Sequence, residues 1–244
     1  MIQLVLKCLL CSVVYLFLID TLAYGQGERM ETIVVTGTKL DADEIRERPS
    51  AALRVRADFV VFEVTYVNSN LDLSDRRAEL EQTYEQLDKA ISKDRTLQLF
   101  IGNAESRAPS ETASFEDVYR NRGQQAYLNF VLEVTLQKEE TFRDVRKRVD
   151  GLLDGIAPIG LTQSYVGDEQ YLGLRNPSRH RPKLIETIWQ DIYLSAGFAD
   201  NINVKVEGLE RRTQTLQVDA LHVDLFIPYT VEFTADLNAT LTTD

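Results

Sequence analysis

The chain has 244 residues, enough for one large domain or two small ones, and its formal net charge is −11. Hydrophobic residues make up 44% and charged residues 27%, an ordinary balance for a globular protein that argues against wholesale disorder. The acidic excess argues against nucleic acid and anionic membrane surfaces as partners, because both require clustered lysine and arginine. The longest basic cluster beyond the N-terminus, Arg143 to Arg148, contains Asp144 and Val145, which is typical of a solvated helix face.

Residues 1–25 have the pattern of a signal peptide. Lys7 supplies a positive charge, and Cys8 to Ile19 form an apolar run of the length of a signal-peptide core. Small residues at Ala23 and Gly25 predict cleavage before Gln26, and hence a periplasmic or secreted protein. The run is short for a membrane span, so no integral span is expected after cleavage; an uncleaved anchor is the alternative.

Both cysteines, Cys8 and Cys11, fall inside this segment. A lipoprotein site needs a small residue before the modified cysteine, whereas Lys7 and Leu10 stand there. The mature chain therefore has no cysteine, which fits an exported protein that is stabilised by its core rather than by disulfides.

The first elements of the mature chain are two strands and a helix. Residues 31–39 are β-rich and predict a short strand, and a charged connector completes the segment 26–53. Apolar residues recur at the two-residue period of a strand over residues 55–67 and, from Asp72, at helical spacing. The apolar positions are Val60, Phe62, Val64 and Tyr66 on the strand and Leu73, Leu80, Tyr84, Leu87 and Ile91 on the helix. The helix is expected to lie on the apolar face of the strand.

Strands and helices continue to alternate further along the chain. Strands are expected at residues 96–101, 125–137, 159–172, 202–206 and 215–233, and helices at 140–154 and 182–196. Residues 102–123 are expected to form a long loop with a helical turn near residues 115–119. Pro228 predicts an edge position or a bulge in the last strand, and residues 236–244 predict a flexible tail.

This order predicts an α+β fold for residues 54–235. Its mainly antiparallel sheet would carry about three helices on one face, in two halves of βαβ type.

Several strings stand in a characteristic order. Ile33-Val34-Val35-Thr36-Gly37 has the form I-x-V-x-G, and Ala57-Asp58-Phe59-Val60 enters the next strand. The later strings are Leu73 to Ile91, Tyr127 to Leu136, Val149 to Ile156, Ser195 to Gly197 and Val204 to Glu207. In this order they resemble the SIMPL-domain family, also called DUF541, of exported bacterial proteins with some eukaryotic relatives. Ala57 stands where that family usually has proline, and residues 40–53 look like an insertion.

The resemblance covers residues 31–235 and implies a non-enzymatic protein of the periplasm or cell exterior. Members of the family tend to form ring-like homo-oligomers and are loosely associated with envelope or oxidative stress. Two isolated histidines and the lack of cysteine in the mature chain argue against a metal site, and no cofactor and no catalytic residue is expected.

Residues 31–39 also resemble the TonB box, an extended segment that outer-membrane receptors offer to the energy-transducing protein TonB. A β-prone strand formed by Ile33, Val34, Val35, Thr36 and Gly37 would add to a sheet edge of an envelope protein partner. A receptor is excluded, because its barrel needs many more strands than the chain has. The other interpretation is that these residues form the first strand of the domain.

Candidate residues for chemistry are few. His180 and His222 are the two histidines, and both are expected to be solvated rather than catalytic or metal-binding. No glycine-rich phosphate loop and no Gly-x-Ser-x-Gly motif is present, which argues against an enzyme. An uncharacterised hydrolase is the second alternative. Trp189, at helical spacing with Ile185 and Ile192, is expected in the core, with an oligomer contact as the alternative.

Overall fold

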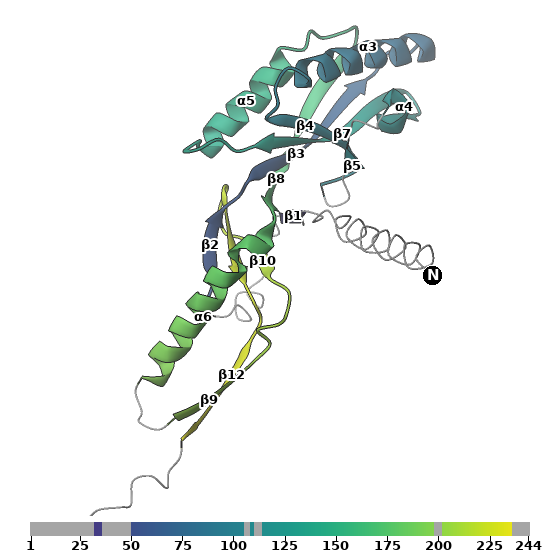
Figure 1. Cartoon of the computed structure of the whole chain (residues 1–244). Helices are drawn as coiled ribbons and strands as arrows, with labels where there is room; N and C mark the ends of the chain where they lie inside the picture. Colours follow the sequence, from purple (N-terminus) through teal and green to yellow (C-terminus); the bar gives the residue numbers. More distant parts are fainter. Residues whose placement is uncertain (1–31, 36–49, 105–107, 110–113, 198–201, 236–244) are drawn as a thin grey trace, which may run out of the picture. The chain divides into compact units, whose positions relative to one another are not determined.

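The computed structural model describes residues 32–35, 50–104, 108–109, 114–197 and 202–235, drawn in colour in Figure 1. Strands and helices alternate along them in an α+β fold, and each pairing between the described strands is antiparallel. The helices are α3 (Leu73–Ile91), α4 (Phe115–Val118), α5 (Phe142–Asp154), the 3₁₀ helix η2 (Pro177–His180) and α6 (Arg181–Ala196). The predicted fold class is confirmed.

The described strands form three sheets. The seven-stranded sheet has the order β1-β8-β3-β7-β4-β5, and β6 also pairs with β7. Its strands are β1 (Thr32–Val35), β3 (Phe59–Asn68), β4 (Leu97–Ile101), β5 (Ala108–Pro109), β6 (Tyr119–Arg122), β7 (Gln125–Thr135) and β8 (Thr162–Arg175). A three-stranded sheet joins β10 (Gln214–Gln217), β11 (His222–Phe226) and β2 (Leu53–Arg56), and a hairpin joins β9 (Ile202–Glu207) to β12 (Thr230–Ala235).

Strand β3 and helix α3 form the predicted strand–helix unit. Asp72 caps α3 by accepting hydrogen bonds from the backbone N–H groups of Ser74 and Asp75, which would otherwise lack partners. The apolar face of β3 is buried together with Leu80 and Leu87 of the helix. The two-residue period of β3 and the helical spacing of α3 therefore both arise from burial in one core.

Helix α5 lies on the same side of the seven-stranded sheet as α3 (Figure 1). Thr141 and Asp144 cap each other reciprocally, so the helix begins at Phe142, two residues later than predicted. Val145 and Val149 are fully buried in the shared core.

The predicted strand over residues 55–67 is two strands in different sheets. The N–H of Ala57 donates to the carbonyl of Leu221, beside the small sheet, at 2.8 Å. The next N–H, that of Asp58, donates to the carbonyl of Gly173 in β8 at 2.9 Å. The chain changes sheets between β2 and β3 without interrupting the alternation, which is why the sequence pattern showed one strand.

The predicted strand over residues 215–233 is also divided. Residues 218–222 turn the chain between β10 and β11, where Val218 donates its N–H to the carbonyl of His222 at 3.0 Å. Pro228 lies between β11 and β12 and has no N–H to donate to a ladder. The predicted long loop contains the short helix α4 and strand β6, which turns into β7 through Gly123 at a φ of 61°.

Helix α6 packs on the three-stranded sheet through β2, whereas the sequence placed all helices on one sheet. Leu184, Ile188 and Ile192 form its buried face. Tyr229 donates its hydroxyl hydrogen to the carboxylate of Asp191 at 3.1 Å, which ties the helix to the segment after β11. Among the residues that the structure describes, no helix is both long and apolar enough to cross a membrane.

Candidate functional site

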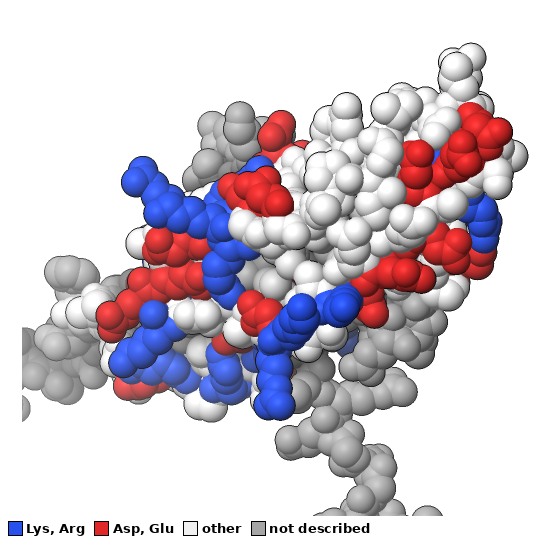
Figure 2. Space-filling view, turned by 90° about the horizontal axis from the view of Figure 1, so that it is seen from above, with Lys and Arg blue, Asp and Glu red and all other residues white. Residues whose placement is uncertain are grey.

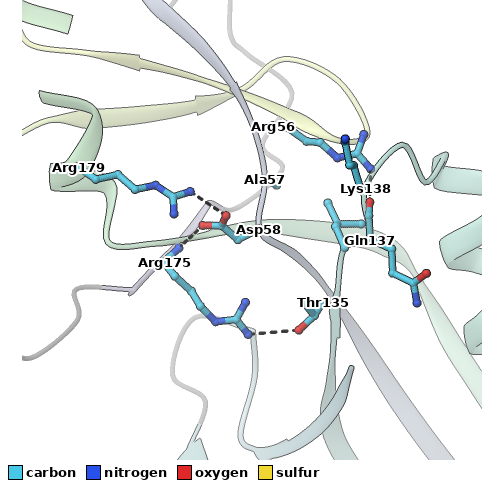
Figure 3. A pocket seen from close by; sticks show the side chains of 9 residues that line it. Arg56, Ala57, Asp58, Thr135, Gln137, Lys138, Arg175 and Arg179 are labelled. Carbon is cyan, nitrogen blue, oxygen red and sulfur yellow. Dashed lines mark hydrogen bonds and ion pairs between the residues drawn. The ribbon is translucent and has the colours of Figure 1, made fainter. Parts of the chain in front are cut away.

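A hollow of about 370 Å³ lies where the ends of several strands meet, and it is called the basic hollow below (Figure 3). Its lining residues are Arg56, Ala57, Asp58, Thr135, Leu136, Gln137, Lys138, Arg175 and Arg179. Phe59 pairs with Thr135 of β7 and with Gly173 of β8, so the sheet register brings these distant segments together. Side chains that follow β2, β7 and β8 therefore surround one space.

The lining carries four cationic side chains and one carboxylate, in a protein whose net charge is −11. The face drawn in Figure 2 shows acidic and basic side chains interspersed, with acidic ones more extensive on its right. The basic hollow is therefore a local reversal of the charge of the protein.

Asp58 is the one carboxylate in the lining, and both of its oxygens accept hydrogen bonds. Nη2 of Arg179 donates to Oδ1 at 2.8 Å, and the backbone N–H of Arg175 donates to Oδ2 at 2.7 Å. Figure 3 shows both interactions. These two donors are therefore already occupied by a carboxylate of the protein itself.

Arg175 is fixed from three sides. Its guanidinium forms an ion pair with the buried carboxylate of Glu133 and lies 3.4 Å from Oγ1 of Thr135. Its Cζ also lies 4.8 Å from the ring centroid of Phe59, a cation–π arrangement. The orientation of this guanidinium is set before any ligand arrives.

The charges of Arg56 and Lys138 are not neutralised in the same way. Nη2 of Arg56 donates to the backbone carbonyl of Glu140, which orients the guanidinium without cancelling its charge. The carboxylate of Glu140 is itself paired with Arg148. Neither Arg56 nor Lys138 forms an ion pair with another residue in the described part of the chain.

The two histidines lie on different elements. His180 precedes α6, and its Nε2 accepts a hydrogen bond from Nε of Arg179 at 3.0 Å. Burial, and then the charge of Arg179, lower the pKa of His180, so the ring is neutral near pH 7. His222 lies opposite Arg56 in the small sheet, with Nδ1 2.9 Å from Asp219. Among the described residues, no group of three or more His, Cys, Asp or Glu side chains could hold a metal ion.

A second hollow, of about 330 Å³, lies between α3, α5 and the start of β8. Its lining includes Tyr66 and the nearly buried hydroxyls of Thr83 and Thr162. The hydroxyl of Tyr66 is buried without a hydrogen-bond partner among the described residues, and burial raises the pKa of this phenol. The hollow has room for a water molecule that would satisfy the hydroxyl.

Trp189 lies at the surface of α6 rather than in the core, with 36% of its area exposed. Its ring lies against that of Tyr193, with the two centroids 6.1 Å apart. Tyr193 and Leu194 are 70% and 75% exposed. The end of α6 therefore presents a cluster of large apolar side chains, defined here as the α6 patch (Trp189, Tyr193 and Leu194).

The N-terminal strand β1 is paired within the domain. Ile33, Val34 and Val35 lie opposite Leu174, Gly173 and Leu172 of β8, at the edge of the seven-stranded sheet. Thr36 and Gly37 lie outside the described residues. The pairing favours the interpretation of these residues as the first strand of the domain.

Removing β1 is expected to destabilise the domain. A chain that starts at residue 40 should melt several degrees below one that starts at residue 26, because β8 loses its outer partner. Circular dichroism melting of the two chains measures the difference. Equal melting temperatures would contradict a structural role and favour the partner-strand interpretation.

Sequence reasoning did not identify the residues of the basic hollow as a site. Arg56, Lys138 and Arg175 are far apart in the chain and form no local motif. The available signal was that each stands at or near one end of an expected strand, where a sheet gathers side chains that are distant in sequence.

A comparison with protein-family models finds no match to the chain, and a search of curated proteins finds no significant match either.

Proposed function

We propose that the protein is an exported, non-enzymatic protein of the cell envelope, of the SIMPL type, that acts by assembling with further copies of itself. The observation that carries assembly is the α6 patch. Export is supported by the signal-peptide pattern of residues 1–25, and the SIMPL type by the ordered strings of residues 31–235.

The α6 patch has the composition of a contact surface. Trp and Tyr are enriched in interfaces between proteins, and clustered exposed apolar side chains mark such interfaces. The helix already uses Leu184, Ile188 and Ile192 to bind the small sheet. The patch is therefore an additional apolar surface, which a second copy of the chain would cover.

Light scattering coupled to size-exclusion chromatography on residues 26–244 tests this proposal. The unchanged chain should elute as an oligomer, and Trp189→Glu/Tyr193→Glu should shift it to the mass of a monomer, because buried carboxylates disfavour the interface. Lys183→Glu, an exposed change on the same helix with the same effect on net charge, should leave the oligomer intact. A monomeric unchanged chain would refute the proposal.

An adaptor for a TonB-type partner is the second candidate, and the edge position of β1 favours it. An edge strand can accept a further strand from another protein. The deletion of residues 26–39 described above separates the two candidates, because an adaptor would lose its partner, whereas assembly through the α6 patch would persist.

A further inference from the structure

The basic hollow contains more positive charge than its own residues neutralise. Glu133 balances Arg175, and Asp58 balances Arg179. Arg56 and Lys138 are left without an ion pair among the described residues, and both line the same space. Two cations without an ion pair that line one space repel one another unless an anion lies between them.

Two of the cationic side chains are held in place. The carbonyl of Glu140 orients Arg56, and Arg175 is held by Glu133 and the ring of Phe59. A guanidinium presents a planar set of N–H donors that matches the oxygens of a phosphate group. Fixing the donors in advance reduces the entropy that binding would cost.

The charge balance selects the kind of anion. Asp58 is already paired with Arg179, so the two cations left for a ligand, Arg56 and Lys138, match the two charges of a dianion. The volume of about 370 Å³ lies at the lower end of the range for small-molecule sites and exceeds the needs of a lone phosphate ion. Leu136 and Ala57 contribute apolar surface to the lining beside the cations.

We infer that the basic hollow binds a phosphate group, either as the free ion or as the monoester of a small molecule or lipid. Arg56 and Lys138 supply the charges that the ligand neutralises, and the guanidinium of Arg175 supplies N–H donors in a fixed orientation. The site is distinct from the α6 patch and does not depend on assembly.

Calorimetric titration of residues 26–244 at pH 7.5 and low salt tests the site, with inorganic phosphate and glycerol 3-phosphate as ligands. Cosedimentation with phosphatidylcholine vesicles, with and without phosphatidic acid, tests the lipid source. At least one of these ligands should bind, and Arg56→Gln/Lys138→Gln should raise its Kd at least tenfold. Binding of glycerol 3-phosphate or of the ion alone would assign a soluble ligand, and binding only to phosphatidic acid would assign the lipid.

The matched control is Arg143→Gln/Lys147→Gln, which removes the same charge from the exposed face of α5. This control should leave the Kd within twofold of the unchanged chain, and both double variants should keep its circular dichroism spectrum. Equal weakening by the two double variants would show nonspecific attraction and overturn the site. Absence of binding to all three ligands at millimolar concentration would overturn it as well.

Discussion

Asn68→Asp is expected to lower the free energy of unfolding by about 3 kcal/mol at neutral pH. Asn68 is fully buried at the end of β3, and its Nδ2 donates to Oε2 of Glu79 at 2.6 Å and to Oγ1 of Thr162 at 2.8 Å. An aspartate has no N–H to donate, so two carboxylates would face each other, one of them at a fully buried position. The loss combines a missing hydrogen bond with the repulsion of like charges.

The effect should depend on pH with a definite sign. The hydrogen bond from Asn68 is the main cause that lowers the pKa of Glu79, and N–H groups of Leu161 and Asn70 add to it. In the unchanged protein, the stabilisation from Glu79 is therefore present above the ordinary carboxyl pKa and is lost as the pH falls. In the variant, the two facing carboxylates repel each other, which raises the pKa of one of them. Stability is therefore regained as the pH falls towards the pKa of free carboxyl groups.

Urea unfolding at pH 8, 7, 6 and 5 measures the difference between the two proteins. The difference in free energy of unfolding should be largest at pH 8 and should decrease towards pH 5. Asn129→Asp is the control, because Asn129 is exposed on β7 and only accepts a hydrogen bond from Thr65, which aspartate can also accept. Its effect should stay below about 0.5 kcal/mol. A difference in free energy of unfolding that does not change with pH would contradict the predicted repulsion between the two carboxylates.

The network around Glu79 joins three segments that the sequence could not place together. Asn68 ends β3, Glu79 belongs to α3, and Leu161 donates its N–H to Glu79 from the loop before β8. Periodicity revealed the strand and the helix, because burial of one face imposes a repeat of two or 3.6 residues. Periodicity does not show which loop a polar residue at the end of a strand or helix will contact.

The same limit applies to the sheets and to the basic hollow. Ala57 continues the alternation of its neighbours, but its N–H bonds to Leu221 beside the small sheet, whereas that of Asp58 bonds to β8 of the large sheet, so the pattern could not show the break. The fold class was predictable because it depends on the kinds and order of elements. The hollow was not, because Arg56, Lys138 and Arg175 meet through strand register, a long-range property that one sequence does not display.

Trp189 shows a further limit of helical spacing. Ile188 and Ile192 are buried on the small sheet, and Trp189 is next to this stripe around the helix. Spacing gives the direction of a side chain, but burial depends on how far the covering sheet extends. A three-stranded sheet leaves the margin of the stripe exposed.

Gly173→Val is expected to destabilise the protein by about 3 kcal/mol, against the usual preference of strands for valine. A Cβ at position 173 would lie 1.9 Å from Cζ of Phe59, the residue opposite it in β3. The ring of Phe59 is fully buried among Val61, Ala104 and Val131, on the sheet face away from α3. It has no space to retreat, so the melting temperature should fall by roughly 6–12 °C.

The clash is also expected to change the lining of the basic hollow. Arg175 lies over the ring of Phe59, so displacing that ring moves a guanidinium that lines the hollow. Gly167→Val is the control in the same strand, because a Cβ there would meet its nearest atom, the carbonyl oxygen of Glu63, at an ordinary 3.5 Å. Thermal melting should show a change of less than about 2 °C for this control.

Combining Gly173→Val with Phe59→Ala distinguishes a clash from a general weakening of β8. Alanine vacates the space that the valine needs, so the double variant should be more stable than the sum of the two single effects allows. A coupling of at least about 1 kcal/mol is expected in a double-mutant cycle measured by urea unfolding. Additive losses would mean that the two side chains do not compete for one space, and that glycine is needed at position 173 for another reason.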